Sequence, residues 1–266
     1  MSTFDATAGS NNSKLTEIRK TLKHRGFVED NGELVVVKNG IEVRLQGHFK
    51  LDKNNKVKEG KLFGVVVKEY GGDELYRITH MNVKVDKFLD AAYGSSDKWH
   101  KYIPKMFAEE DGILGSFFDD KLYGFNKKDK LIGYGGDDEL HGGKGNDILK
   151  GYTGNDAFVF DEKLNSKHNV DTIRDWNYLK GQGGGTDSIW LDDKIFTAFK
   201  GMDGEGISSK NFVVGSKAKT ADQYLVFREN KQKLYYDADG AGGDAKVLFA
   251  KFSGHHDIGY GDFLIV

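Results

Sequence analysis

A nine-residue repeat between Gly115 and Asp161 constrains this chain more than any other feature. Five consecutive copies begin at positions 115, 124, 133, 142 and 151. Glycine is the first residue and aspartate the sixth residue of every copy, and the eighth residue is leucine in four copies and phenylalanine in the fifth. Because three positions keep the same phase through all copies, the pattern indicates a repeat architecture in which each copy stacks on its neighbours.

Each constrained position has a physical role. A nonapeptide with one apolar position cannot bury that side chain alone, so the copies must stack their eighth residues into a shared interior, as a coil of short parallel strands does. Residues seven to nine are therefore expected to form strands. The glycine-rich remainder is expected to form turns, where glycine adopts positive φ and lets carbonyl groups approach one another closely.

The repeated aspartates point to a cation. Stacked turns would bring these carboxylates within a few ångströms of one another, which is costly unless a positive ion lies between them. From Asp111 to Asp161 there are ten acidic residues against six lysines. Carboxylate and carbonyl oxygens, without His or Cys in the core of the pattern, are the ligands of a hard cation, and calcium matches them best.

The pattern resembles the G-G-x-G-x-D-x-U-x repeat of RTX (repeats-in-toxin) proteins, a family whose parallel β-roll binds calcium between stacked turns. In that family two copies make one coil, so the aspartate of one copy meets the aspartate two copies on. The resemblance therefore implies up to three ion positions, each between successive aspartates of one of two rows: between 120 and 138, between 138 and 156, and between 129 and 147. One row has Asp120, Asp138 and Asp156, and the other has Asp129 and Asp147.

The first two copies depart from the family pattern, because Phe118 and Lys127 replace glycine at the fourth position and Lys128 adds positive charge. The expected sites are therefore those of copies three to five. Asp171 and Asp175, in a following segment similar to the flanks of RTX rolls, are candidates to close the last site, with a solvated strand face as the alternative. The metal-binding residues implied by the resemblance are Asp120, Asp129, Gly133, Gly135, Gly136, Asp138, Gly142, Lys144, Gly145, Asp147, Gly151, Thr153, Gly154, Asp156, Asp171 and Asp175.

Two other readings of the repeat are weaker. Ordinary Asp-Gly turns in a β-rich domain would explain the composition, since aspartate bonds its own backbone in turns, but not the fixed period. The repeat does not match a phosphate-binding motif. Gly143-Lys144-Gly145 lacks the Ser or Thr that follows Lys in a P-loop, and no G-x-G-x-x-G spacing occurs between Gly133 and Gly151.

Bulk composition limits the class of protein. The 266 residues suffice for one large or two ordinary domains, and the net charge of −2 indicates no strong attraction to nucleic acid or anionic membranes. No cysteine is present, so disulfides and thiolate zinc sites are excluded. The start of the chain lacks the basic and apolar regions of a secretory signal, and no apolar run approaches the roughly 20 residues of a membrane span.

The residues before the repeat are expected to form a disordered tail over 1–12 and a β-rich unit over 13–110. Alternating apolar residues on both sides of Asn39-Gly40 predict a hairpin over 33–45. Further strands are expected at 47–52, 61–69, 74–80 and 82–88, and short helices at 13–25, 88–93 and 97–110. This unit is expected either to cap the open end of the coil or to present a binding surface.

The residues after the repeat (111–161) form a C-terminal region over 162–266. The stretch from Lys233 to Gly242, with Val247 to Ala250 and the terminal Asp262 to Val266, is similar to the C-terminal region of type I secretion substrates, where it is an uncleaved export signal. A hairpin at Asp239-Gly240 with a final buried strand is a compatible reading. Asp237 and Asp239 are further candidates for cation contact, but they lack the EF-hand continuation.

No catalytic motif is recognisable. The eight histidines form no H-E-x-x-H, G-x-S-x-G is absent, and the adjacent His255-His256-Asp257 lies in the expected export region. Paired carboxylates brought together by strands stay an open alternative. The sequence thus predicts a mainly all-β protein, a calcium-binding β-roll with a β-rich N-terminal cap, secreted through a type I apparatus.

Two alternative functions are carried forward. The N-terminal unit would bind an extracellular or cell-surface polysaccharide, as an adhesion or biofilm component, if its aromatic residues formed a stacking platform. A polysaccharide-modifying enzyme is the third reading. The aromatic residues of that platform would be Trp99, Tyr70, Tyr76 and Tyr93.

Overall fold

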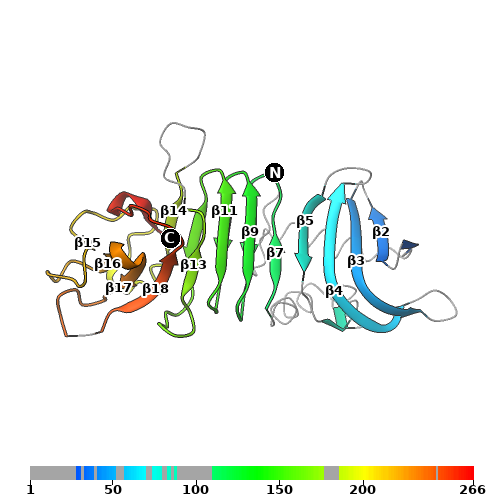
Figure 1. Ribbon diagram of the computed structural model, residues 1–266, viewed down its shortest axis with the longest axis horizontal. Coiled ribbons are helices and arrows are strands. Elements are labelled where there is room, and N and C mark those ends of the chain that lie inside the picture. Colours follow the sequence, from blue (N-terminus) through cyan, green and yellow to red (C-terminus); the bar gives the residue numbers. More distant parts are fainter. Residues whose placement is uncertain are drawn as a thin grey trace.

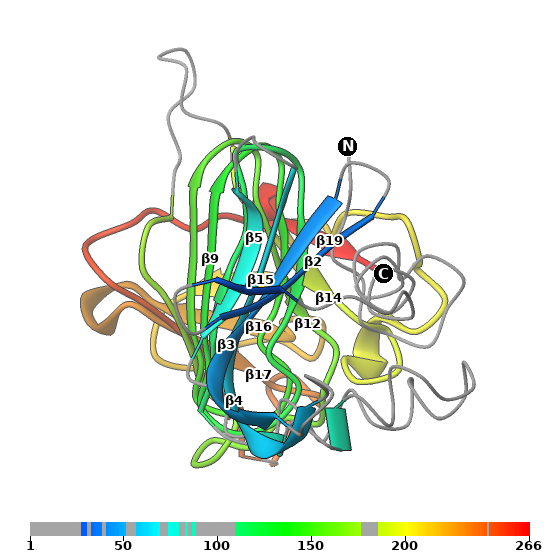
Figure 2. The ribbon, with the colours of Figure 1, turned by 90° about the vertical axis from the view of Figure 1, so that its right-hand side faces the viewer.

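The strands of the computed structural model lie side by side along the long axis of the molecule (Figure 1). The structure describes residues 28–30, 33–38, 41–51, 57–69, 74–79, 83–84, 87–88, 110–176, 186–243 and 245–266. One long sheet runs through these residues from end to end. A shorter sheet of five strands lies against it in the repeat region, so that the molecule has two layers there (Figure 2).

Successive repeats alternate between the two sheets. The long sheet takes β7 (Gly112–Leu114), β9 (Lys130–Gly135), β11 (Ile148–Thr153) and β13 (Asp171–Ile173), and the short sheet takes β8 (Lys121–Tyr123), β10 (Glu139–His141), β12 (Ala157–Phe160), β14 (Ser188–Leu191) and β19 (Phe263–Ile265). Pairing is parallel throughout, and Lys130 lies opposite Ile148 as Lys121 lies opposite Glu139. One coil therefore contains two copies, and the expected class, mainly all-β with the parallel sheets of a β-roll, is confirmed.

The eighth residue of each copy fills the space between the sheets. Leu122, Leu131, Leu140, Leu149 and Phe158 are each 0% exposed. Ile113, Ile173 and Ile189 are at most 1% exposed in the strands that flank the repeat. Because each such side chain contributes roughly 1.5–3 kcal/mol when fully buried, stacking of the copies supplies the interior that a single copy lacks.

The long sheet continues into the N-terminal part of the chain. Its strands there are β1 (Val28–Asp30), β2 (Glu33–Lys38), β3 (Ile41–Leu51), β4 (Val57–Glu69), β5 (Glu74–Thr79) and β6 (Val83–Lys84), all antiparallel. Lys38 pairs with Ile41, which confirms the predicted hairpin. Strands expected separately at 41–45 and 47–52 are one strand, because a bulge at Gln46 and Gly47 bends β3 without ending it.

β5 joins the two parts by pairing with β7, with Arg77 opposite Leu114. The edge of β7, the first strand of the coil in the long sheet, is therefore covered by an antiparallel strand. This pairing is compatible with the capping role expected for residues 13–110.

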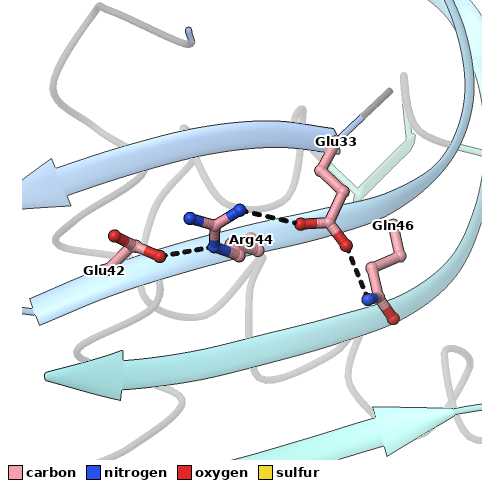
Figure 3. Close-up of polar contacts among 4 residues, drawn as sticks. All are labelled: Glu33, Glu42, Arg44 and Gln46. Carbon is pink, nitrogen blue, oxygen red and sulfur yellow. Dashed lines mark hydrogen bonds and ion pairs between the residues drawn. The ribbon is translucent and has the colours of Figure 1, made fainter. Parts of the chain in front are cut away.

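Strand β3 has one apolar and one polar face. Val43 and Leu45 are fully buried in the core, whereas Glu42, Arg44 and Gln46 alternate with them on the other face. There Arg44 forms ion pairs with Glu42 and, at 3.1 Å, with Glu33 of β2, whose second oxygen accepts from Gln46 at 2.7 Å (Figure 3). These contacts satisfy the polar groups of a half-buried face and fix the register of β2 against β3.

The C-terminal part completes both sheets. β15 (Phe212–Val214), β16 (Leu225–Arg228), β17 (Lys233–Tyr236) and β18 (Val247–Phe252) extend the long sheet, and the short 3-10 turns are η1 (Thr197–Phe199), η2 (Glu229–Lys231) and η3 (Tyr260–Asp262). β17 and β18 form the expected hairpin, with Tyr236 opposite Val247. The expected final strand is β19, in which Ile265 is 0% exposed.

Several expectations fall on other parts of the chain. The tail over 1–12, the helix over 13–25, and nearly all of the helices over 88–93 and 97–110 lie outside the described residues, as do Trp99, Tyr70 and Tyr93. Across the residues that the structure does describe, no helix combines the length and apolar character needed to cross a bilayer.

Candidate metal centre

Two rows of buried aspartates run along the two edges of the coil, where each turn leads into a strand. The Asp120 row contains Asp120, Asp138, Asp156 and Asp187, and the Asp129 row contains Asp111, Asp129, Asp147 and Asp171; all are at most 4% exposed. Within each row, Oδ1 of one aspartate accepts a hydrogen bond from the backbone N–H of the aspartate one coil earlier, at 2.7 to 3.2 Å. The structure thus brings together the carboxylates that the repeat predicted to meet.

The second carboxylate oxygen behaves differently from the first. Oδ2 of Asp129, Asp138, Asp147 and Asp156 is buried and accepts no hydrogen bond from the protein. A buried carboxylate oxygen without a partner carries a large desolvation cost, so its persistence in four successive copies calls for a positive ligand.

Asp120 departs from the other repeat aspartates. Its Oδ2 accepts hydrogen bonds from the backbone N–H of Ser116 at 2.6 Å and from the Ser116 hydroxyl at 2.8 Å. The first turn therefore satisfies its own carboxylate. This is the copy in which the sequence also departs from the family pattern at Phe118.

The free oxygens face the first glycine of their own copy. A Cβ placed on Gly133 would lie 1.9 Å from Asp138 Oδ2 and 3.0 Å from the carbonyl oxygen of Gly151. On the other edge, a Cβ on Gly124 would lie 2.9 Å from Asp129 Oδ2 and 2.5 Å from the carbonyl oxygen of Gly142. Carboxylate and carbonyl oxygens from two coils thus converge on a space that any larger residue would fill.

The glycines at the fourth position serve a different purpose. A Cβ on Gly145 would lie 1.6 Å from the carbonyl oxygen of Lys127, and one on Gly154 would lie 1.9 Å from that of Gly136. Turns of successive coils therefore pack backbone against backbone. The side chains of Lys127 and Lys128 are exposed, so their charge points away from the buried carboxylates.

The remaining predicted residues lie in these turns. The backbone of Lys144 forms a parallel β-bridge with Asn126, and its ammonium group lies 3.7 Å from the carboxylate of Glu162 at the surface. The Thr153 hydroxyl donates to the Tyr134 carbonyl oxygen at 3.2 Å, beside Gly135. The Lys144 ammonium group cannot ligate a cation, so Lys144 would offer only its backbone carbonyl, whereas the Thr153 hydroxyl already donates to the Tyr134 carbonyl oxygen.

Burial changes the acidity of the aspartates. Removal from water, reinforced by neighbouring carboxylates, raises the pKa of Asp138 from 3.8 to about 9 and that of Asp129 to about 8. Burial likewise raises the pKa of Asp147 to about 7 and that of Asp156 to about 6. Burial and the Asp147 charge hold the pKa of Asp171 well above its usual range. A metal-free coil therefore retains protons on these groups, or holds charge at high cost.

The two flanking candidates have different surroundings. Asp171 continues the Asp129 row, since Asp147 donates to its Oδ1 at 3.0 Å. Asp175 instead accepts the backbone N–H groups of Gly151 at 3.1 Å and Tyr152 at 2.7 Å. Both oxygens of Asp175 thus hold the turn of copy five in place.

The arrangement fits calcium. Hard oxygen ligands from carboxylates and carbonyls converge at each coil, and the described residues of the two rows include no histidine. The family model described as RTX calcium-binding nonapeptide repeat (4 copies) matches residues 123–158. This segment is an RTX calcium-binding repeat. RTX nonapeptide repeats bind Ca²⁺, so residues 123–158 are a calcium-binding segment.

The RTX match extends from the end of β8 into β12 and therefore includes Asp129, Asp138, Asp147 and Asp156. These are the same four residues whose Oδ2 lacks a partner. No curated protein matches the chain.

The sequence prediction missed the two residues that extend the rows. Asp111 lies 18 residues before Asp129 and donates to it, and Asp187 accepts from Asp156 at 3.2 Å. Asp111 could have been identified from that spacing, because 18 residues make up one coil. Asp187 lies 31 residues after Asp156, so an insertion interrupts the 18-residue period that would have assigned it to the Asp120 row. Asp237 and Asp239 follow β17 and belong to neither row.

Proposed function

We propose that this RTX protein is secreted through a type I apparatus and folds its coil when it binds extracellular calcium at the two aspartate rows. The metal-binding residues are those of copies three to five together with Asp129, Asp171 and the missed Asp187. The observation that carries this proposal is the set of four buried carboxylate oxygens that face glycine-lined spaces without a protein partner.

Calcium supplies the positive charge that the rows need. The chain's own residues form the space for the ion, here called the cradle. The first glycine of each copy leaves this space open, and the hydrogen bonds to Oδ1 fix the orientation of each carboxylate. Without the cation, charged aspartates in one row are cut off from water and also repel one another at the spacing of successive coils, and burial first and repulsion second raise the pKa values of Asp129 and Asp138. The coil is therefore poised to be unstable at neutral pH when calcium is scarce.

The energy available from calcium is large enough to decide whether the coil folds. At a calcium concentration ten times the dissociation constant, each site contributes about 1.4 kcal/mol to the folded state. Three sites together contribute about 4 kcal/mol, which is comparable with the stability of a small domain. Extracellular sites with dissociation constants on the order of 10⁻⁴ to 10⁻³ M would fill outside the cell and stay empty inside it.

Calcium-coupled folding is tested by far-UV circular dichroism and by unfolding in urea, each with calcium and with a chelator. We expect strand signal and a cooperative transition in calcium, and for the coil in chelator a weaker strand signal and a transition at a lower urea concentration. A coil equally folded in both conditions would contradict the switch while leaving simple calcium binding intact.

Export is supported by the resemblance of the C-terminal region to type I substrates. Its test is expression of the full chain beside a type I apparatus, with and without the segment from residue 233 to 266. We expect the full chain in the medium and the shortened chain in the cells. Equal amounts of both chains outside the cells would place the signal elsewhere.

A further inference from the structure

A cluster of three potential metal ligands lies apart from both aspartate rows. Glu229, His255 and Asp257 each bring a side-chain ligand atom within 4.8 Å of the other two, at the surface. Glu229 begins η2, between β16 and β17, whereas the other two residues follow β18. These strands lie at the end of the molecule away from β2 and β3 (Figure 1).

Gln232 holds the two segments together. Its side-chain oxygen accepts the backbone N–H of His256 at 2.9 Å, and its side-chain nitrogen donates to the His256 carbonyl oxygen at 3.1 Å. Its own carbonyl accepts from Phe252 at 3.0 Å, at the end of β18. The backbone that carries His255 is therefore fixed against the turn that carries Glu229, so the cluster does not depend on long side chains meeting by chance.

The two adjacent histidines have separate roles. His256 Nε2 lies 2.7 Å from the Ser253 carbonyl oxygen, a contact that requires a proton on that nitrogen and leaves it no lone pair for a metal. His255 Nε2 instead points to Glu229 and lies 3.7 Å from its Oε1. One imidazole and two carboxylates thus have ligand atoms within 4.8 Å of one another.

We propose that Glu229, His255 and Asp257 form a site for a transition-metal dication such as zinc. An imidazole nitrogen suits zinc, cobalt and nickel, whereas calcium prefers oxygen ligands only. Three protein ligands with a fourth position open to water are a common zinc arrangement. Metal bonds of about 2.0–2.2 Å require the ligand atoms to approach to about 3.4 Å, and the exposed side chains are free to rotate by that amount.

A metal bound there would join η2 to the segment that leads into β19. Because β19 is the last strand of the short sheet, this link would stabilise the C-terminal end of the molecule without touching the calcium coil. The chain would then use two classes of metal at two places, a hard cation in the coil and a softer one at this surface.

The test is zinc titration of the full chain by isothermal calorimetry, in saturating calcium so that the aspartate rows are occupied. We expect one zinc per chain, and at least tenfold weaker binding in His255→Ala and in Asp257→Asn. His168→Ala is the matched control, because His168 is another exposed histidine outside the cluster, and it should bind zinc as the original chain does. Cobalt in place of zinc should give a visible absorption band that His255→Ala removes.

Three results would overturn the proposal. The first is the absence of saturable zinc binding in saturating calcium. The second is zinc binding that survives His255→Ala unchanged, and the third is an equal loss in His168→Ala. Circular dichroism of each variant in calcium establishes that the fold is retained, so that lost binding reports the site itself.

Discussion

The backbone N–H of Asp147 donates to Oδ1 of Asp171 across 3.0 Å, and so it joins the repeat to a residue outside it. The spacing between these two residues is 24, whereas it is 18 between successive members of the same row within the repeat. The six additional residues lie in the loop between β12 and β13. The row therefore continues in space after the sequence period has ended.

Replacing Asp138 by asparagine separates the cost of burying its carboxylate from the stabilisation that a bound calcium ion supplies. Asparagine keeps an oxygen that accepts from Asp120 but removes a buried carboxyl group that, without calcium, must either hold a proton or hold a charge at high cost. In chelator at pH 8, Asp138→Asn should raise the free energy of unfolding by roughly 1 kcal/mol or more, since it removes a desolvated carboxylate. Calcium at ten times the dissociation constant should then stabilise the variant by about 1.4 kcal/mol less than it stabilises the original chain, because one site is lost, so the gain seen in chelator should disappear.

Urea unfolding with and without calcium measures both effects. Asp203→Asn is the control, since Asp203 is exposed and outside both rows, and it should alter neither value. A destabilisation by Asp138→Asn of the same size with and without calcium would show that the carboxylate has only a structural role.

The metal-free protein should lose stability as the pH rises. The folded-state pKa values of Asp156, Asp147, Asp129 and Asp138 are raised from 3.8 to about 6, 7, 8 and 9. Between pH 4 and pH 9 the folded state therefore binds more protons than the unfolded chain, so the free energy of unfolding falls with pH across this window. His141 acts in the same direction, because its hydrogen bonds to Asp161 and Glu139 outweigh burial and raise its pKa.

Thermal unfolding in chelator at pH 5 and pH 8 tests this dependence. We expect the higher midpoint at pH 5. Calcium should weaken or reverse the trend, since the ion replaces the protons and binds better to ionised carboxylates. A metal-free midpoint that rises from pH 5 to pH 8 would contradict the raised pKa values.

The repeat could be predicted from sequence because its constraints are local and periodic. Glycine at the first position, aspartate at the sixth and an apolar eighth residue each have one physical explanation, and Leu140 and Asp138 lie where that explanation requires. The alternation of copies between two sheets followed from the family resemblance, and the pairing of Lys121 with Glu139 agrees with it.

The ends of the coil were harder to predict because they depend on contacts between distant residues. Asp187 occupies its place in the Asp120 row only after a long insertion, and no period in the sequence marks it. The pairing of β5 with β7 likewise joins residues that share no pattern. The difference at Asp120 depends on the Ser116 hydroxyl, which a search for glycine and aspartate alone does not consider.

The first glycine of a copy should be irreplaceable where the oxygens converge. In Gly133→Ala the new Cβ would lie 1.9 Å from Asp138 Oδ2, so the carboxylate or the turn must move. We expect a loss of roughly 1–3 kcal/mol in stability and weaker calcium binding at this site. Gly215→Ala is the control, since its Cβ meets nothing within 4 Å, and it should leave both unchanged. Calorimetric calcium titration and urea unfolding measure the two effects, and equal behaviour of the variants would refute the cradle.

The extension of both rows beyond the RTX match predicts calcium sites that the repeat alone would not supply. Oδ2 of Asp147 and Oδ2 of Asp171 lie 2.7 and 2.9 Å from the same point, the position of a Cβ on Gly142. An ion held there would have one ligand within the match and one outside it. Asp171→Asn should therefore reduce the number of calcium ions bound by one, measured by equilibrium dialysis or by anomalous scattering from crystals grown in calcium. Asp193→Asn, a change in the loop after β14, should leave the number unchanged. If Asp171→Asn binds as many ions as the original chain, the calcium sites end with the repeat and Asp171 serves only to hold the backbone of Asp147.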